Sequence, residues 1–283
     1  MTLTVVVLAK NEASNIEACI ASAAGADEIL VIDDHSQDNT AELALKMGAR
    51  VVTRALDDFA SQMNFAASQA GSDWIFILDS DERFTPGLMD QIRSHMAGGP
   101  KEVGAVRRKN FAFGRRHRFG PLKPDRVPRL FPKGAVVWRG LVHAKPHFDL
   151  PEKDLGWLLH YTYKNWDHYF QKLDQYAGLW AQDAHRRGRR VSTGQTWLRL
   201  VWNQFKMFFI NLGIMGGPVT WILCFLNGEY TLKKYLKLME LNQSDRDKAP
   251  SGRFLSSVSG SPTTLVNEPS MDSTRKPPQP CRP

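Results

Sequence analysis

Residues 73–82 read DWIFILDSDE, an apolar run that ends abruptly in acidic side chains. Trp74 to Leu78 contains no polar residue, which is typical of a strand covered on both faces in a parallel sheet. Asp79 and Asp81 are two positions apart, so on an extended backbone their side chains leave the same face. Two such carboxylates could hold Mg²⁺ or Mn²⁺ with the help of substrate phosphates. The alternative is a solvated turn after a buried strand.

The rest of the first hundred residues alternates short apolar runs with helical patterns. We expect strands at 3–8, 28–32 and 50–53, and helices at about 13–24, 40–47, 59–70 and from Thr85, with Pro86 at the first helical position. This alternation predicts an α/β fold with a mostly parallel, Rossmann-like sheet and helices on both faces. In such folds ligands bind at the carboxyl ends of the strands.

Polar side chains follow three of the predicted strands where each strand ends. They are Lys10, Asn11 and Glu12 after the first, Asp33 and Asp34 after the second, and Asp79 and Asp81 after the fourth. The first turn reads KNEA and is not rich in glycine, so neither a dinucleotide fingerprint nor a P-loop is present. We therefore expect one rim where a metal holds a phosphate and acids hold a base or ribose.

Three motifs in this order, VVVLAKNEASNI, ILVIDDHSQDNT and DWIFILDSDE, resemble the amino-terminal half of the inverting family 2 glycosyltransferases, which have the GT-A fold. The resemblance covers residues 2–100. It implies that Asp33 or Asp34 contacts the base or ribose of a nucleotide sugar, with Lys10, Asn11 and Glu12 nearby. Asp79 and Asp81 would form the metal motif, with Asp81 in the catalytic centre. Gln62 and Asn64 would face the nucleotide sugar, or else form a polar helix face.

The middle of the chain is basic, with interleaved aromatic residues in VGAVRRKNFAFGRRHRFG at 103–120. We expect strands at 103–106 and 135–138, with proline-marked loops between them. The basic stretch is interpreted as a loop that contacts a phosphorylated saccharide acceptor through Arg115, Arg116 and Arg118. A solvated basic loop is the alternative. Such a stretch could also grip single-stranded nucleic acid, but no nucleic-acid module is recognisable, so nucleic acid is not an expected partner.

The segments RLF, WRG and VHA resemble RLF, WxG and VHE on the acceptor side of the same family, which implies acceptor contacts for Arg129 and Trp138. The final Glu of that pattern is the natural general base, and here the position holds Ala144. His143 is the first substitute, as base or as a further metal ligand. Other candidates for the base are Asp125, Asp149 and Glu152. A catalytically weakened homologue or a silent scaffold remains an alternative.

The carboxyl-terminal half shows apolar residues at helical spacing. Residues 207–226 carry almost no charge but are broken by glycines and Pro218, so we expect two short helices in a membrane interface. They are flanked by basic residues, Arg199, Lys206, Lys233, Lys234 and Lys237. A buried helical hairpin and a true membrane span are the alternatives.

The segments HYTYKNWDHYFQKLDQYA and GEYTLKKYLKLME resemble bacterial lipopolysaccharide core β-glucosyltransferases, so that the narrower resemblance covers residues 1–242. It implies transfer of glucose, from UDP-glucose, to an inner-core heptose of a lipid-linked saccharide. The alternative acceptor is another lipid-linked or polyprenyl phosphate. We therefore expect a nucleotide-sugar-binding half (1–100), an acceptor-side part (101–156), a helical membrane-associating region (157–242) and a disordered tail (243–283).

The overall composition agrees with an anionic partner such as substrate phosphates or an acidic membrane, since the formal charge is +8 and the pI is near 9.4. Three widely separated cysteines predict a reducing compartment without disulfides. No basic leader precedes the first strand, so we expect no secretory signal. These features predict a cytoplasmic protein, peripheral on the inner face of the bacterial cytoplasmic membrane.

Overall fold

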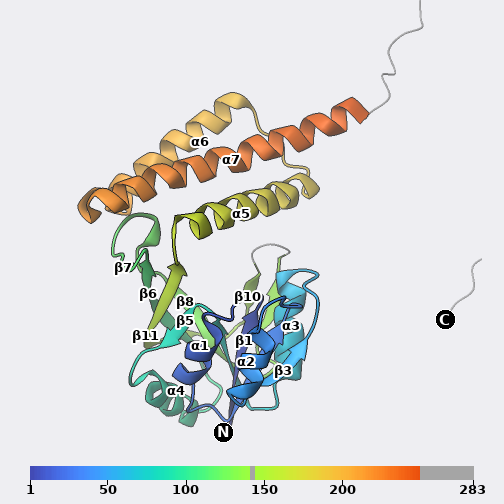
Figure 1. Ribbon diagram of the computed structural model, residues 1–283, viewed down its shortest axis with the longest axis vertical. Coiled ribbons are helices and arrows are strands. Elements are labelled where there is room, and N and C mark those ends of the chain that lie inside the picture. The colour runs from blue at the N-terminus through green and yellow to red at the C-terminus, as the bar shows by residue number, and fades with distance from the viewer. Residues whose placement is uncertain (141–143, 249–283) are drawn as a thin grey trace, which may run out of the picture.

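Strand β1 (Leu3–Ala9) lies between two parallel neighbours, β2 (Glu28–Asp33) and β4 (Trp74–Asp79), in the computed structural model, which describes residues 1–140 and 144–248. Figure 1 shows the sheet to which they belong. The order in that sheet is β3-β2-β1-β4-β8-β6-β11-β5, with β7 paired to β6. The remaining strands are β3 (Arg50–Thr53), β5 (Glu82–Phe84), β6 (Val103–Ala112), β7 (Arg115–Arg116), β8 (Arg126–Pro132) and β11 (Glu152–Tyr163).

The sheet is mixed, which corrects the expectation of a mostly parallel one. Strands β3, β2, β1 and β4 run parallel. Beyond β4, strand β8 pairs antiparallel with both β4 and β6, β6 pairs parallel with β11, and β5 closes the edge antiparallel to β11. Most of the basic stretch expected to be a loop is strand, because β6 continues to Ala112 and turns at Phe113 and Gly114 into β7.

Two apolar clusters cover the two faces of the parallel half, because successive strand residues point to opposite sides. Val5 and Val7 pack toward α1 (Ile16–Ser22), α2 (Thr40–Lys46) and α4 (Leu88–Ala97). Val6 packs toward α3 (Phe59–Gln69) and the hairpin of β9 (Val137–Arg139) and β10 (Lys145–His147). Helix α4 begins two residues after Pro86, because Gly87 adopts φ 80° as its N-cap.

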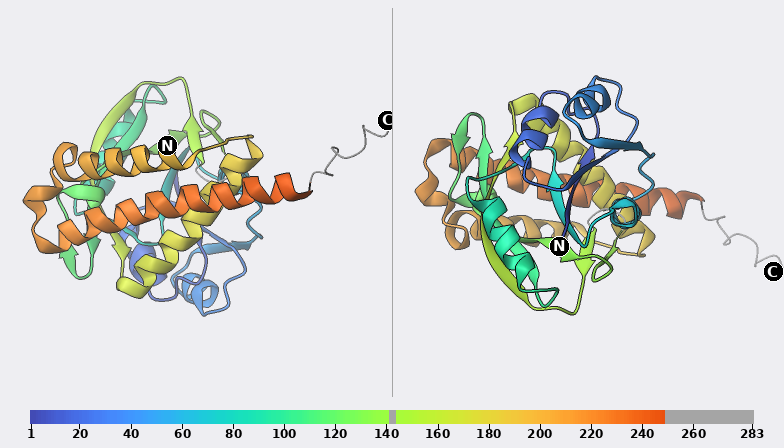
Figure 2. Two further views of the ribbon diagram at one scale, coloured as in Figure 1. Left: turned by 90° about the horizontal axis from the view of Figure 1, so that it is seen from above. Right: turned by 90° about the horizontal axis from the view of Figure 1, so that it is seen from below.

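Three long helices form a separate layer above the carboxyl ends of the strands, where α5 lies between the sheet and the outer pair of α6 and α7 (Figures 1 and 2). They are α5 (Trp166–Arg186), α6 (Thr193–Phe205) and α7 (Pro218–Lys248). The short segment η1 (Gly120–Leu122) packs against this layer. Every fourth residue or so along α5, from Tyr169 to Ala184, is buried, which is the stripe expected of a helix that packs on one side.

Residues 207–226 do not form the two short helices that we expected. The chain continues from α6 through a π-helical segment, η2 (Lys206–Ile210), and a 3₁₀ turn, η3 (Gly213–Gly216), and Pro218 opens α7 at its first position, where a missing N–H is tolerated. In the part of the chain that the structure describes, no helix combines the length and apolarity needed to cross a bilayer.

Two of the expected segment boundaries fall inside regular elements. Strand β11 runs through the boundary at 156/157, and helix α7 runs through the one at 242/243. The tail that we expected to be disordered therefore begins with a helical stretch up to Lys248, and residues 249–283 lie outside the described residues.

Candidate functional site

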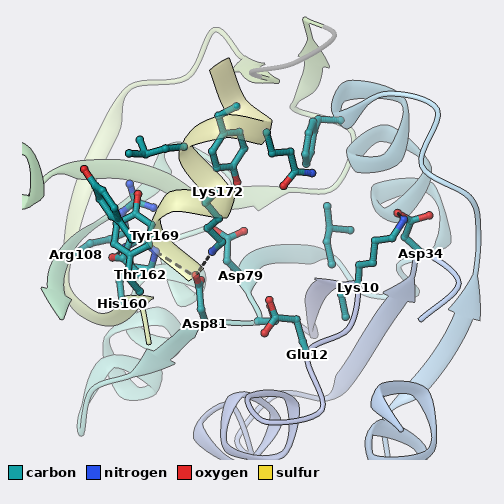
Figure 3. Close-up of a pocket in the computed structure, with 18 of the residues that line it drawn as sticks. Lys10, Glu12, Asp34, Asp79, Asp81, Arg108, His160, Thr162, Tyr169 and Lys172 are labelled. Atoms are coloured by element: carbon teal, nitrogen blue, oxygen red, sulfur yellow. Dashed lines mark hydrogen bonds and ion pairs between the residues drawn. The ribbon is translucent and has the colours of Figure 1, made fainter. Parts of the chain in front are cut away.

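A cavity of about 770 Å³ lies between the carboxyl ends of the strands and the overlying helices α5 and α7 (Figure 3). Strand β1 and the turn after it contribute Lys10 and Glu12, and β2 leads into Asp34. Strand β4 contributes Asp79, which is followed by Asp81. The polar ends of these three strands therefore share one cavity, as the parallel arrangement predicts.

At one end of the cavity Asp34 is held from two sides. Its Oδ2 accepts from Lys10 Nζ at 2.7 Å and its Oδ1 accepts from the Leu56 N–H at 2.9 Å. Burial opposes ionisation, but these donors prevail and lower the pKa of Asp34. Apolar side chains surround this carboxylate, from Leu8, Ile32, Leu56, Phe59 and Met63. An ionised acceptor in an apolar recess suits the polar edge of a nucleobase or a ribose.

In the middle of the cavity Asp79 lies against a buried ion pair. Arg129 Nη2 donates to Asp79 Oδ2 at 2.5 Å and to Glu82 Oε1 at 2.6 Å, and Glu82 is fully buried. Burial opposes ionisation of Asp79, yet the charge of Arg129 lowers its pKa to about 2. Asp79 also keeps 38% of its side chain exposed. It is therefore a fixed, ionised carboxylate with access to the cavity.

Asp81 faces the imidazole of His160 and the ammonium group of Lys172, which come from the carboxyl-terminal half. Its Oδ1 lies 3.6 Å from His160 Nε2 on β11, and its Oδ2 lies 3.6 Å from Lys172 Nζ on α5, as Figure 3 shows. Burial opposes ionisation, but the neighbouring His160 and Lys172 favour it, so the pKa of Asp81 is lowered. The roof helix α5 thus supplies a positive charge directly to the acidic motif.

The tautomer of His160 follows from its neighbour Asn110. The Nδ2 of Asn110 donates to the carbonyls of Leu122 and Lys123, so its Oδ1 is left to accept from His160 Nδ1 at 2.8 Å. His160 Nε2 then presents its lone pair toward Asp81 in the neutral form. Two ligand atoms about 2.1 Å from one divalent ion lie roughly 3–3.5 Å apart, near the spacing seen here. The donor set therefore fits a divalent metal.

A metal at this position would still need help from a substrate. In residues 1–140 and 144–248, no group of three or more His, Cys, Asp and Glu side chains is arranged to hold an ion. Mg²⁺ characteristically takes one or two carboxylates and completes its shell with phosphates and water. Asp81 and His160 are the pair that could supply two ligands, Asp79 lines the same cavity, and the proposed ligand His143 lies outside the described residues.

Other residues predicted for the donor site support its walls. Gln62 is buried at the cavity edge, where its amide bonds to Arg54. Asp33 accepts from Ser36, and Asn11, at φ 55°, binds Gln37 N–H through its Oδ1, so both brace the loops after β1 and β2. Asn64 lies outside the cavity, because both its amide atoms bind the backbone of Trp138.

The residues predicted for acceptor binding do not line the cavity. Arg115 and Arg116 are exposed on the β7 hairpin and Arg118 follows it, Trp138 packs in the core below α3, and Arg129 is buried behind Asp79. Among the candidate bases, Asp125 is bound by Arg108 and Glu152 by Arg126. Sequence reasoning missed His160, in the polar segment HYTY, and Lys172, on the helix after it.

Comparison with known proteins gives one family. The model of "Glycosyl transferase family 2" matches residues 4–144. An uncharacterized glycosyltransferase of Rickettsia conorii is 24% identical over 255 residues, covering 84% of this chain and 89% of that protein. The lipopolysaccharide core biosynthesis glycosyltransferase LpsC of Rhizobium meliloti is 26% identical over 203 residues, covering 67% and 74%.

Solved structures give a weaker likeness. Glucosyl-3-phosphoglycerate synthase from Mycobacterium tuberculosis, in complex with Mn²⁺, UDP and glucosyl-3-phosphoglycerate, has a TM-score of 0.46 and 17% identity, covering 68% of this chain and 81% of that one. The assignment rests on the sequence matches and on a mixed α/β sheet of GT-A type whose acidic strand ends share a cavity. Residues 4–144 therefore form a family 2 glycosyltransferase domain, and most of the chain is similar in sequence to proteins named as glycosyltransferases.

Proposed function

We propose that the chain is a metal-dependent, inverting hexosyltransferase that takes glucose from UDP-glucose. The observation that carries this proposal is the sharing of one cavity by Asp34, Asp79 and Asp81, which come from two separate strand ends. Asp34 would contact the base or ribose in its apolar recess, and the other two would lie at the diphosphate. Glu12, which also lines the cavity, would lie beside the ribose.

Each group has a defined task in this reaction. A bound Mg²⁺ or Mn²⁺ would act as a Lewis acid and neutralise charge on the departing diphosphate. Asp81 and His160 would supply protein ligands, and Asp79 would lie beside them at the diphosphate. Arg129 keeps Asp79 ionised and fixed in position. Lys172 Nζ faces Oδ2 of Asp81, whereas His160 faces Oδ1. Lys172 would stabilise negative charge on the diphosphate oxygens as the bond to the sugar breaks.

The acceptor hydroxyl needs a base within hydrogen-bond reach. We keep His143 as the proposed base, because Asp125 is bound to Arg108 through both carboxylate oxygens, and this pairing lowers its pKa against the effect of burial. A low pKa makes a carboxylate a poor proton acceptor. The residue at the family's usual base position, Ala144, has no titratable group, so a catalytically weakened homologue is the alternative.

We propose an inner-core heptose of lipopolysaccharide as the acceptor. The similarity to LpsC and the motifs of the carboxyl-terminal half support this choice. Another lipid-linked or polyprenyl phosphate acceptor is the alternative. Either acceptor would place the protein at the inner face of the cytoplasmic membrane, where a basic chain meets anionic lipids.

The membrane contact that we propose is the outer face of α6, η2, η3 and the start of α7. This face, called the outer apolar face below, exposes large side chains, namely Trp197, Leu198, Val201, Trp202, Phe205, Phe209, Ile210, Ile214, Met215, Trp221, Ile222 and Phe225. Between Val191 and Gly228 the sequence has no acidic residue, while Arg199 and Lys206 are basic. An apolar patch with basic residues and without acids suits an anionic bilayer surface.

Calorimetric titration tests the donor site directly. We expect one nucleotide sugar of a panel that includes UDP-glucose to bind with Mn²⁺ and at least tenfold more weakly with EDTA. Asp81→Asn should remove the metal dependence, whereas Asp57→Asn, a control carboxylate on the exposed side of Arg54, should not. Binding of no member of the panel, or binding indifferent to metal, would contradict the proposal. Binding without turnover on either acceptor would favour the weakened homologue.

A further inference from the structure

The end of the cavity farthest from Asp34 has a different chemistry from the donor end. Four tyrosines line it, Tyr163 from β11, Tyr169 and Tyr176 from α5, and Tyr230 from α7, together with Leu122, Leu173, Leu223 and Asn227. This part is called the tyrosine chamber below, and Figure 3 shows Lys172 and Asp81 between its Tyr169 and Asp34. The chamber therefore begins where the sugar of a bound donor would meet its acceptor.

The tyrosine hydroxyls are free to bind a ligand. Within the described residues, none of the four hydroxyls has a hydrogen-bond partner. None of them is a fully buried atom, so each is accessible to a ligand. Burial raises the pKa of Tyr163 to about 12 and raises that of Tyr176 as well. All four therefore remain neutral hydroxyls that can both donate and accept. Asn227 adds a side-chain NH₂, since its Oδ1 is occupied by Asn203.

The charged side chains beside the chamber already face carboxylates. Arg108 bonds to Asp125 and lies 3.4 Å from Glu82, and Lys172 lies 3.6 Å from Asp81. Aromatic faces with neutral hydroxyls and amides match the alternating C–H faces and hydroxyls of a sugar ring. An acyl or prenyl chain would cover those hydroxyls without pairing them, which is unfavourable.

We propose that the tyrosine chamber binds an uncharged saccharide unit of the acceptor, so that acceptor specificity is set by α5 and α7 and not by the basic β7 hairpin. This inference rests on the proposed function. Helix α7 then serves two surfaces, because Leu223, Asn227 and Tyr230 line the chamber while Trp221, Ile222 and Phe225 are exposed on the outer apolar face. The spacing of the first set, four and three residues, keeps it on one side of the helix.

Tyr176→Phe and Tyr230→Phe test the proposal with minimal change in packing. The probe is a heptose-containing core oligosaccharide freed of its lipid, titrated into protein that holds UDP and Mn²⁺. Each loss of a hydroxyl should weaken oligosaccharide binding about 2- to 10-fold, and the double variant should weaken it further. The affinity for UDP should change less than twofold. The matched control is Tyr161→Phe, which removes an exposed hydroxyl on the same strand as Tyr163 but outside the cavity.

The possible results separate failure of the chamber from failure of the proposed function. Loss of UDP binding by the unaltered protein would refute the donor site. Normal UDP binding with an oligosaccharide affinity that the variants leave unchanged, or with no oligosaccharide binding, would overturn the chamber alone. Preferential binding of a polyprenyl phosphate that is indifferent to both substitutions would show a lipid channel in its place. Weaker UDP binding in Tyr230→Phe would place the nucleotide here and also overturn the inference.

Discussion

Arg129 lies at the centre of the buried charges of the site, and its surroundings predict a role in stability. The side chain is 9% exposed and bonds to both Asp79 and Glu82. Without it, the buried Glu82 would keep the backbone N–H of Asp79 at 3.1 Å and Arg108 at 3.4 Å. Arg129→Met should therefore lower the free energy of unfolding by about 3–5 kcal/mol, the usual effect of breaking a buried pair. Urea unfolding followed by circular dichroism measures it.

The control for this prediction is Arg126→Met on the same strand, whose pair with Glu152 is more exposed. That substitution should change the free energy of unfolding by less than about 1 kcal/mol. If Arg129→Met left stability unchanged but raised the KM for the acceptor, the family-based assignment of Arg129 to acceptor binding would hold and the structural role inferred here would not.

His160 gives the sharpest prediction about the metal. Because Asn110 fixes its tautomer, Nε2 is free to bind a cation beside Asp81. His160→Gln should weaken Mn²⁺ binding in the presence of UDP about 10- to 100-fold, the range typical of changes around a metal site. Titration of free Mn²⁺ by electron paramagnetic resonance measures this without any need for turnover. His147→Gln on exposed β10 should match the unaltered protein, and equal affinities in all three would exclude His160 as a ligand.

At the scale of elements, the connection from α6 to α7 depends on close packing at Gly213. A Cβ at this position would come within 2.5 Å of both Met207 O and Cys224 Sγ. The backbone oxygen cannot move aside easily, so Gly213→Ala should destabilise the protein by about 1–3 kcal/mol. Gly194→Ala, in the first turn of α6 with open space around it, should be neutral or stabilising by up to about 1 kcal/mol. Urea midpoints of the two variants should move in different directions.

The elements that the sequence predicts well are those with a local signal. Residues 74–79 form a buried strand, as their apolar run indicates, and the helices at 40–46 and 59–69 match their predicted ranges closely. The half of the sheet beyond β4, which mixes parallel and antiparallel pairs, could be predicted in this way only at 103–106. Its strands contain charged residues such as Arg107 and Arg126, whose pairing partners lie far apart in the chain, so periodicity alone suggested loops.

In the candidate site, too, only the residues with a local sequence signal could be predicted. The acids of the donor rim follow strands and could be placed together from topology alone. His160, Lys172 and the tyrosine chamber come from a strand and two helices that reach the rim through tertiary packing, and no spacing in the sequence links them to Asp81. Trp138 and Asn64 were selected by resemblance to a motif, yet they bind each other below the sheet.

For the molecule as a whole, the layered arrangement links the catalytic cavity to the outer apolar face. Helix α5 has one side toward the cavity through Lys172 and Tyr176, and it packs on α7 through Asp174, which bonds to Lys237 at 3.0 Å. Helices α6 and α7, which carry the outer apolar face, lie beyond α5 as seen from the sheet (Figure 1). A lipid-linked acceptor held in a bilayer would thus reach the cavity around the edge of this layer.

Vesicle binding tests this arrangement. We expect the protein to sediment with vesicles that contain phosphatidylglycerol and much less with vesicles of phosphatidylcholine alone, because each basic residue near an anionic surface contributes about 1 kcal/mol. Raising the salt to about 0.5 M should weaken binding, since screening shortens the reach of these charges. The double substitution Leu198→Glu and Trp202→Glu should reduce binding at least tenfold, as it removes exposed apolar area and adds negative charge to the same helix.

The matched control is the double substitution Leu45→Glu and Met47→Glu at the end of α2, where both side chains are exposed and lie outside the helical layer. It adds the same two negative charges to the chain and should leave vesicle binding within twofold, because it is remote from the outer apolar face. If both variants bound equally well, the attraction would come from net charge alone. If the unaltered protein ignored vesicles but formed dimers that the double substitution dissolved, a second copy would cover this face, since apolar area of this extent is buried either by lipid or by protein.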